Sequence, residues 1–178
     1  MPARTYHQQS PSAPGSASTQ AAATRVPRPL RWLVPGLLGL IVLYAALPIV
    51  MMLDREFLGA SIMRNNPDLD PAWLDRSVTD AIIYTVALHA IDIVLATWFV
   101  VKSLQGRNWA RIALTVYLVL ATLLGMISVA AGPEYYWAAF GADAIHIAMI
   151  VLLWVPRSSR RFFATRRGAR PLRAPASR

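Results

Sequence analysis

The sequence predicts an all-α fold, a four-helix transmembrane bundle with a helical outer hairpin between the first and second spans. Four mainly apolar stretches lead to this prediction, at residues 32–53, 81–101, 112–131 and 137–155. At a rise of about 1.5 Å per residue, roughly twenty residues cross a hydrocarbon layer about 30 Å thick. Composition agrees, because 56% of the 178 residues are hydrophobic and the mean hydropathy is +0.41. Such values are typical of a polytopic membrane protein.

The basic residues indicate which way the spans face. Of the 18 lysines and arginines, four precede the first span, three lie between the second and third, and eight follow the fourth. Only Arg55, Arg64 and Arg76 fall on the other side, in a segment that also carries acidic residues. This positive-inside pattern predicts a plasma-membrane protein with both termini in the cytoplasm. It also accounts for the net charge of +9, so we expect the lipid bilayer as a partner and no nucleic acid. Seventeen of the 18 basic residues are arginine, a bias that indicates a high-GC bacterial genome.

Residue types exclude several kinds of chemistry. The chain has no cysteine, which excludes disulfides and thiol catalysis. The sequence also contains no glycine-rich phosphate loop and no nucleophile with a credible base and oxyanion hole. We therefore expect the protein not to be an enzyme.

Three regions follow one another along the chain. Residues 1–31 are rich in Pro, Ser, Ala and Gln without apolar periodicity, which predicts a disordered cytoplasmic tail. Residues 32–155 form the membrane domain, whose first helix is expected to begin near Trp32 and to bend at Pro48, near its outer end. Residues 156–178 form a basic cytoplasmic tail.

The connection between the first two spans is expected to be helical. Ile62 and Met63 continue an apolar face beyond the first span, and residues 65–68 supply a turn. Asp70 then has the properties of an N-cap, with Pro71 at the first helical position. The second helix should therefore begin near Pro71 and continue into the membrane.

The other turns and the hydroxyl residues of the spans have ordinary explanations. Residues 103–108 join the second and third spans so closely that these helices should be antiparallel neighbours. Gly132 and Pro133 are expected to form the outer turn before the fourth span. The hydroxyl groups of the third span are expected to bond to their own helix backbone; these residues are Thr115, Thr122 and Ser128.

The second and fourth spans each contain a histidine and an aspartate three residues apart. His89 and Asp92 lie in the second span, and Asp143 and His146 lie in the fourth. This spacing places each pair on one helical face, at similar depths when residues are counted from the outer ends. An aspartate at a helix centre costs roughly 2.5–3.5 kcal/mol on insertion scales. We therefore expect the two pairs to face one another inside the bundle.

Three interpretations of this polar cluster are open. A structural clamp would hold the second helix against the fourth by His–Asp hydrogen bonds or an ion pair. A proton or ion pathway would use the same groups as relays. Two imidazoles and two carboxylates would also suit a divalent metal, and two histidines on different helices could ligate a haem.

The clamp interpretation leads to a function for the whole chain. We predict a non-enzymatic membrane scaffold or partner subunit, without a cofactor, that associates with itself or with another membrane protein. The alternative is a small transporter, an ion pathway or a metal- or haem-binding membrane protein that uses the cluster. Small multidrug exporters also have four spans but place a carboxylate in the first, and residues 32–53 contain none.

The segment after the fourth span combines arginines with aromatic residues. The rings of Phe162 and Phe163 could lie at the headgroup boundary of an anionic leaflet, with the arginines on lipid headgroups. Orientation of the chain by positive charge explains the same residues equally well. The candidate headgroup contacts are Arg157, Arg160, Arg161, Arg166 and Arg167.

Two segments resemble a known group of proteins. Residues 105–115 (QGRNWARIALT) open the third span and residues 152–160 (LLWVPRSSR) close the fourth. Both are similar to recurring features of small, uncharacterised four-span integral membrane proteins of actinobacteria. Together with the short acidic outer loop, the resemblance covers residues 30–165 and implies a plasma-membrane protein. It implies no substrate or catalytic residue, and the His and Asp pairs are not part of it.

Overall fold

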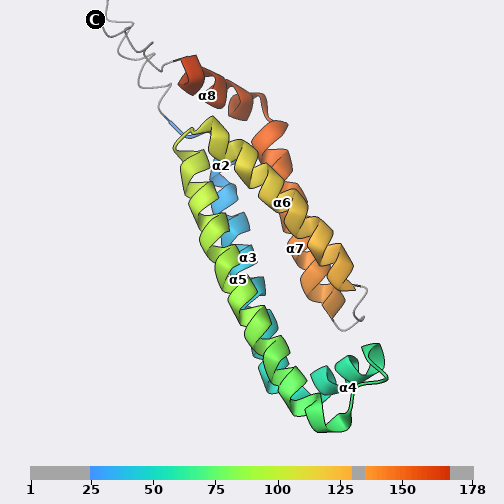
Figure 1. The fold of residues 1–178 in the computed structure, drawn as a ribbon. Coiled ribbons are helices and arrows are strands. Elements are labelled where there is room, and N and C mark those ends of the chain that lie inside the picture. Colours follow the sequence, from blue (N-terminus) through green and yellow to red (C-terminus); the bar gives the residue numbers. More distant parts are fainter. Residues whose placement is uncertain (1–24, 130–134, 169–178) are drawn as a thin grey trace, which may run out of the picture.

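The computed structural model describes residues 25–129 and 135–168, which form helices and turns without a strand. Four long helices make up the bundle: α3 (Leu33–Leu53), α5 (Leu74–Leu104), α6 (Asn108–Val129) and α7 (Tyr136–Trp154). Helix α3 packs against α5 and α7, and α6 packs against the same two helices, so the four surround a common centre. The predicted all-α four-helix bundle is confirmed (Figure 1).

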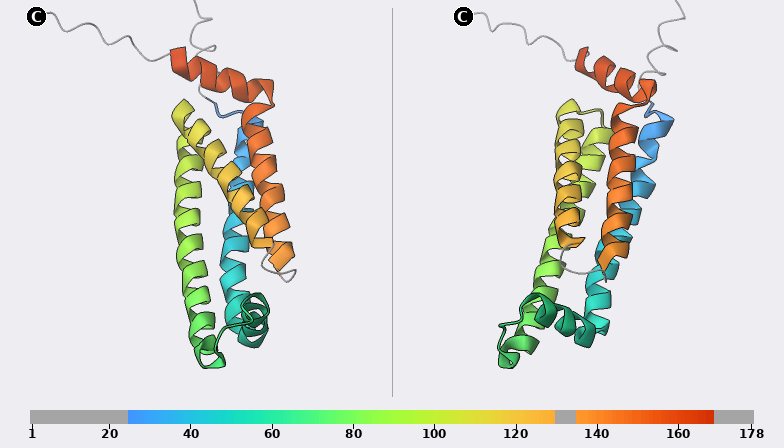
Figure 2. Two further views of the ribbon diagram at one scale, coloured as in Figure 1. Left: turned by 45° about the vertical axis from the view of Figure 1, so that its right-hand side comes forward. Right: turned by 90° about the vertical axis from the view of Figure 1, so that its right-hand side faces the viewer.

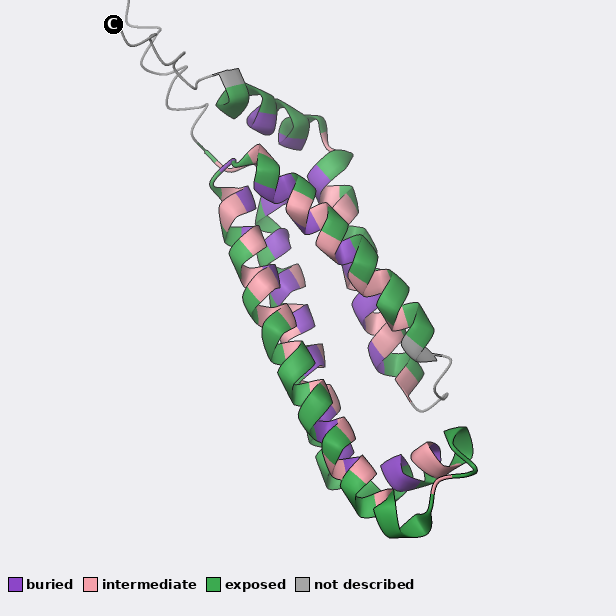
Figure 3. Cartoon of the chain, in the orientation of Figure 1, coloured by how far each residue is buried: buried purple, intermediate pink, exposed green. Residues whose placement is uncertain are grey.

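All four helices are long and apolar enough to cross a membrane. Their outward faces expose large apolar side chains, and Val42, Val94 and Ile127 are 66–69% exposed. Figure 3 shows exposed residues along the outer side of each helix, with buried residues turned toward the neighbouring helices. Monomeric soluble proteins rarely expose contiguous apolar patches larger than a few hundred Å². The exposed pattern is the one that a lipid environment favours. The candidate spans are Arg28–Leu53, Pro71–Leu104, Asn108–Ile127 and Tyr136–Trp154.

The predicted helical connection joins α3 to α5. It consists of α4 (Arg55–Asn65) and the short 3-10 helix η1 (Pro71–Trp73), which leads directly into α5. Both begin at a capping aspartate: Asp54 accepts from the Phe57 amide at 3.0 Å, and Asp70 accepts from the Ala72 amide at 2.9 Å. The second long helical segment thus begins at Pro71, as the sequence predicts. Helix α4 lies beyond the ends of α6 and α7, at one end of the bundle (Figure 2).

Helix α8 (Arg157–Gly168) lies across the opposite end of the bundle (Figures 1 and 2). Beside it, α2 (Arg28–Arg31) precedes α3, so helical structure begins four residues before the predicted start at Trp32. The physical reason is burial, because Leu30 is completely buried in a core that includes Phe162 and Phe163. Residues 1–24 of the predicted tail, residues 169–178 and the predicted turn at residues 132–133 lie outside the described residues.

The turn between α5 and α6 is as short as predicted, because a Schellman motif ends α5. Gly106 has a φ of +78°, which glycine adopts without strain. Its amide donates to the Ser103 carbonyl at 2.9 Å, and the Arg107 amide donates to the Lys102 carbonyl at 3.2 Å. A Cβ at Gly106 would lie 2.9 Å from the Arg166 side chain, so α8 also approaches closely here.

Candidate functional site

A cavity of about 360 Å³ lies between the four long helices. It extends from Asp92 and Tyr117 near the middle of the bundle toward Tyr135, which precedes α7. Its walls are mostly apolar, with leucines and alanines from all four helices. The polar side chains that line it are Tyr44, His89, Asp92, Tyr117, Tyr135, Asp143 and His146. All four residues of the predicted cluster therefore face one cavity.

Each predicted His–Asp pair is in contact within its own helix. His89 Nδ1 lies 3.5 Å from Asp92 Oδ2 on α5, and His146 Nδ1 lies 3.5 Å from Asp143 Oδ1 on α7. The spacing of three residues produces this arrangement, as the sequence indicates. The pair on α7 is the more deeply buried, because 1% of His146 and 6% of Asp143 are exposed.

Tyr44 of α3 links the two pairs. Its hydroxyl forms a hydrogen bond of 3.0 Å with His146 Nε2. Its ring stacks on the His89 imidazole, with centroids 4.8 Å apart and planes 1° from parallel. One side chain of α3 therefore contacts a histidine of α5 and a histidine of α7. Nothing in the sequence marks this role, since Tyr44 is one aromatic residue within a long apolar stretch.

Helix α6 supplies two further partners. The Tyr117 hydroxyl donates to Asp92 Oδ1 at 3.1 Å and also contacts the Asp92 carbonyl oxygen at 3.3 Å. Thr122 Oγ1 forms a hydrogen bond of 3.2 Å with His146 Nδ1. The expectation that Thr122 bonds to its own backbone is therefore wrong, because a buried imidazole lies within its reach. Thr115 follows the expectation and donates to the Arg111 carbonyl at 2.9 Å.

The predicted clamp does not have the expected form. Among the described residues, no hydrogen bond or ion pair joins a histidine or aspartate of α5 directly to one of α7. The two helices lie diagonally across the bundle, and hydroxyl groups of α3 and α6 bridge to them instead. The sequence could not reveal this, because residue spacing within a helix does not specify which helices are neighbours.

Asp143 and His89 are the two residues of the site whose buried polar atoms all lack a hydrogen-bond partner among the described residues. Within the described part of the chain, neither carboxylate oxygen of Asp143 has a hydrogen-bond partner, although its side chain is 91% buried. Gly125 of α6 makes room for it, because a Cβ at that position would lie 3.1 Å from Asp143 Oδ1. A buried polar group without a partner costs about 1–3 kcal/mol, and a charged one costs more. Among the described residues, the one charged contact of Asp143 is His146 Nδ1 at 3.5 Å, so the cavity holds a carboxylate with no hydrogen bond from this part of the chain.

The charge of the cavity is set by its two aspartates. Among the described residues no lysine or arginine lines it, and the basic side chains in its wall are the two histidines. The described residues also include no group of three or more His, Cys, Asp or Glu side chains that could hold a metal ion. An aspartate without a hydrogen bond suits a ligand that carries hydrogen-bond donors or positive charge.

The predicted headgroup contacts lie at the far end of the molecule. All five arginines of α8 in that set are exposed. The two phenylalanines between them are not at a boundary as expected, because Phe162 and Phe163 are buried against the bundle. Arg111 of α6 is enclosed there, with its Cζ 3.7 Å from the centroid of the Trp154 ring and 4.8 Å from that of the Phe163 ring. The aromatic residues attach α8 to the bundle.

No protein-family model, curated protein or solved structure matches this chain.

Proposed function

We propose that this chain is a four-span protein of a bacterial plasma membrane, with both termini in the cytoplasm. We propose further that its central cavity binds a small, mainly apolar molecule that carries an amine or a similar hydrogen-bond donor. The role is binding rather than catalysis. The observation that supports this proposal most strongly is the carboxylate of Asp143, which is buried at the wall of the cavity without a hydrogen bond from any described residue.

Size and polarity support the choice of ligand. A volume of about 360 Å³ is within the range of small-molecule sites, which are mostly apolar with a few placed polar groups. The buried acceptor would gain a donor on binding, and the apolar walls would cover the rest of the molecule. Tyr44 and Tyr117 also line the cavity, and aromatic rings attract a cationic amine.

The scaffold hypothesis makes a different demand on the same residues. A polar group that only holds helices together should be bonded across a helix interface, as Asp92 is bonded to Tyr117. Asp143 is not bonded in this way. Of the functions considered for the sequence, the binding of a ligand as in a small transporter therefore agrees better with Asp143 than a purely structural role does.

A pair of probes tests the ligand proposal. 2-Phenylethylamine and propylbenzene have the same number of heavy atoms, and only the first carries an amine. In detergent, the amine should raise the melting temperature of the protein more than the hydrocarbon does. Asp143→Asn should abolish this difference. The matched control is Asp80→Asn, which removes an exposed carboxylate from the surface and should preserve it. Equal stabilisation by both probes, or an unchanged response in Asp143→Asn, would contradict the proposal.

The membrane location and orientation have a separate test. Because the chain contains no cysteine, a single introduced cysteine reports on one position. Ala60→Cys in α4 and Ala164→Cys in α8 both use exposed alanines, at opposite ends of the bundle. In spheroplasts, a membrane-impermeant maleimide should label Ala60→Cys at once and Ala164→Cys only after lysis. Labelling of Ala164→Cys in spheroplasts and of Ala60→Cys only after lysis would contradict the proposed orientation. Recovery of the protein in the soluble fraction would refute the membrane location.

A further inference from the structure

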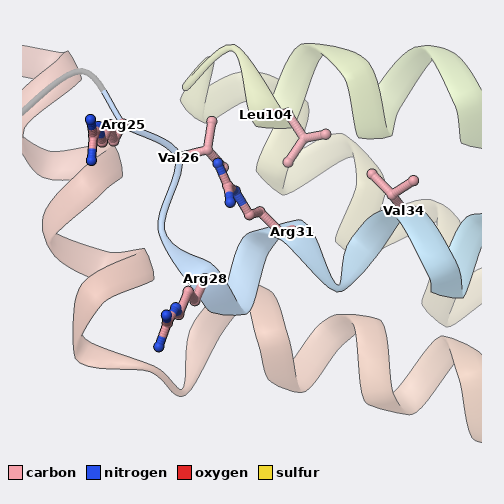
Figure 4. A pocket seen from close by; sticks show the side chains of 6 residues that line it. All are labelled: Arg25, Val26, Arg28, Arg31, Val34 and Leu104. Atoms are coloured by element: carbon pink, nitrogen blue, oxygen red, sulfur yellow. The ribbon is translucent and has the colours of Figure 1, made fainter.

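A second cavity, of about 530 Å³, lies at the arginine-rich end of the bundle. Most of its lining comes from the segment that leads into α3, and the end of α5 completes it (Figure 4). Three of its six lining residues are arginines and the other three are aliphatic. They are Arg25, Val26, Arg28, Arg31, Val34 and Leu104.

The arginines of this cavity have no acidic partner in the described part of the chain. Among the described residues, no side chain forms a hydrogen bond or an ion pair with Arg25, Arg28 or Arg31. The opposite end differs, because Arg55 contacts Asp75 at 3.0 Å and Arg76 contacts Asp80 at 3.7 Å. The acidic residues that the structure describes all belong to that end or to the central cavity, so none of them lies near these arginines.

Three guanidinium groups around one cavity repel one another unless an anion joins them. A phosphate group is the anion that suits arginine best, because its oxygens accept two parallel hydrogen bonds from one guanidinium. The aliphatic residues add a second preference. Val34 is 42% exposed at the start of α3 and continues the cavity toward the apolar surface of the bundle. A ligand that presents a phosphate next to hydrocarbon would fill both parts.

We propose that this cavity binds the phosphate group of an anionic phospholipid, with the lipid's glycerol and upper acyl carbons against Val34 and Leu104. This inference rests on the proposed membrane location, but it does not depend on the ligand of the central cavity. It also differs from the predicted headgroup contacts on α8, whose arginines do not line this cavity. A free phosphate ion shares the chemistry of the headgroup, and the test separates the two sources.

The test counts bound lipids by native mass spectrometry of the full-length protein in detergent. The ligands are dimyristoyl phosphatidic acid, dimyristoyl phosphatidylcholine with the same acyl chains, and inorganic phosphate. Arg28→Gln combined with Arg31→Gln removes two charges from the cavity. The matched control, Arg157→Gln with Arg161→Gln, removes two exposed charges from α8 at the same end of the bundle. All four side chains are exposed, so both double variants should fold.

We expect phosphatidic acid to bind more tightly than phosphatidylcholine, and inorganic phosphate not to compete. The Arg28/Arg31 variant should lose at least about tenfold in affinity for phosphatidic acid, and the α8 variant should lose much less. Three results would overturn the inference. The first is an equal loss of affinity for phosphatidic acid in the two variants, which would indicate nonspecific charge attraction. The second is equal binding of the two lipids, and the third is displacement of phosphatidic acid by inorganic phosphate at comparable concentration. A failure of the amine to bind the central cavity would leave this inference unaffected.

Discussion

Replacement of Asp143 by leucine should stabilise the protein. Leucine has a similar branched shape, and it removes two buried oxygens that have no hydrogen-bond partner among the described residues. Asp143 lines the central cavity, and Gly125 presents no side chain toward it, so the leucine side chain can turn into the cavity. Asp92→Leu is the matched comparison, since it makes the same chemical change at a residue whose Oδ1 accepts from the Tyr117 hydroxyl at 3.1 Å.

The expected effects have opposite signs. Relief of an unsatisfied buried acceptor should raise the free energy of unfolding by about 1–3 kcal/mol in Asp143→Leu. Asp92→Leu removes the 3.1 Å bond from the Tyr117 hydroxyl and leaves it the Asp92 carbonyl at 3.3 Å, so the free energy of unfolding should fall by about 1 kcal/mol. For a chain of 178 residues, each kcal/mol corresponds to roughly 2–4 °C in melting temperature. The two variants should therefore differ by several degrees at least.

The assay is thermal unfolding followed by intrinsic fluorescence, in one detergent and without added ligand. SDS titration of the same samples provides a second measure of stability. The reasoning is refuted if Asp143→Leu is destabilised as strongly as Asp92→Leu, because Asp143 would then hold the bundle together. That outcome would support the scaffold hypothesis. A stabilised variant that no longer binds the amine would instead show that stability has been given up for binding.

Three further substitutions test other parts of the structure by thermal unfolding. Tyr44→Phe keeps the stack on His89 but loses the bond to His146. It should therefore lower the free energy of unfolding by about 1 kcal/mol, and an unchanged free energy of unfolding would contradict that bond. Gly106→Ala should lower the free energy of unfolding by more than about 1 kcal/mol, because the φ of this residue is +78° and the Arg166 side chain is close. An unchanged free energy of unfolding would contradict the turn geometry. Phe163→Ala should cost about 3–5 kcal/mol and expose α8 to trypsin, whereas unchanged cleavage would show that this side chain does not attach α8.

The fold could be predicted from the sequence because its signals are local. Helices of the right length follow from runs of apolar residues, and Asp70 with Pro71 marks the start of the second one. The start of the first helix could not be found in this way. Leu30 belongs to the helical region because it is buried near α8, and such a contact between distant segments leaves no periodic pattern.

The site was predictable only in part. The spacing of His89 with Asp92, and of Asp143 with His146, placed each pair on one face, and all four residues line one cavity. Their partners could not be predicted, because Tyr44 resembles any other aromatic residue of an apolar helix. The unsatisfied state of Asp143 was also beyond the sequence. It depends on which side chains of α6 come near, and glycine stands at the nearest position.

Equilibrium dialysis with radiolabelled 2-phenylethylamine tests the central claim most directly. The purified protein in detergent should bind one amine per chain, and Asp143→Leu should lose this binding although it remains folded. Asp80→Asn, at the exposed end of the bundle, should bind like the parent protein. No saturable binding to the parent protein, or the same binding in Asp143→Leu, would contradict the claim that the buried carboxylate is a ligand site.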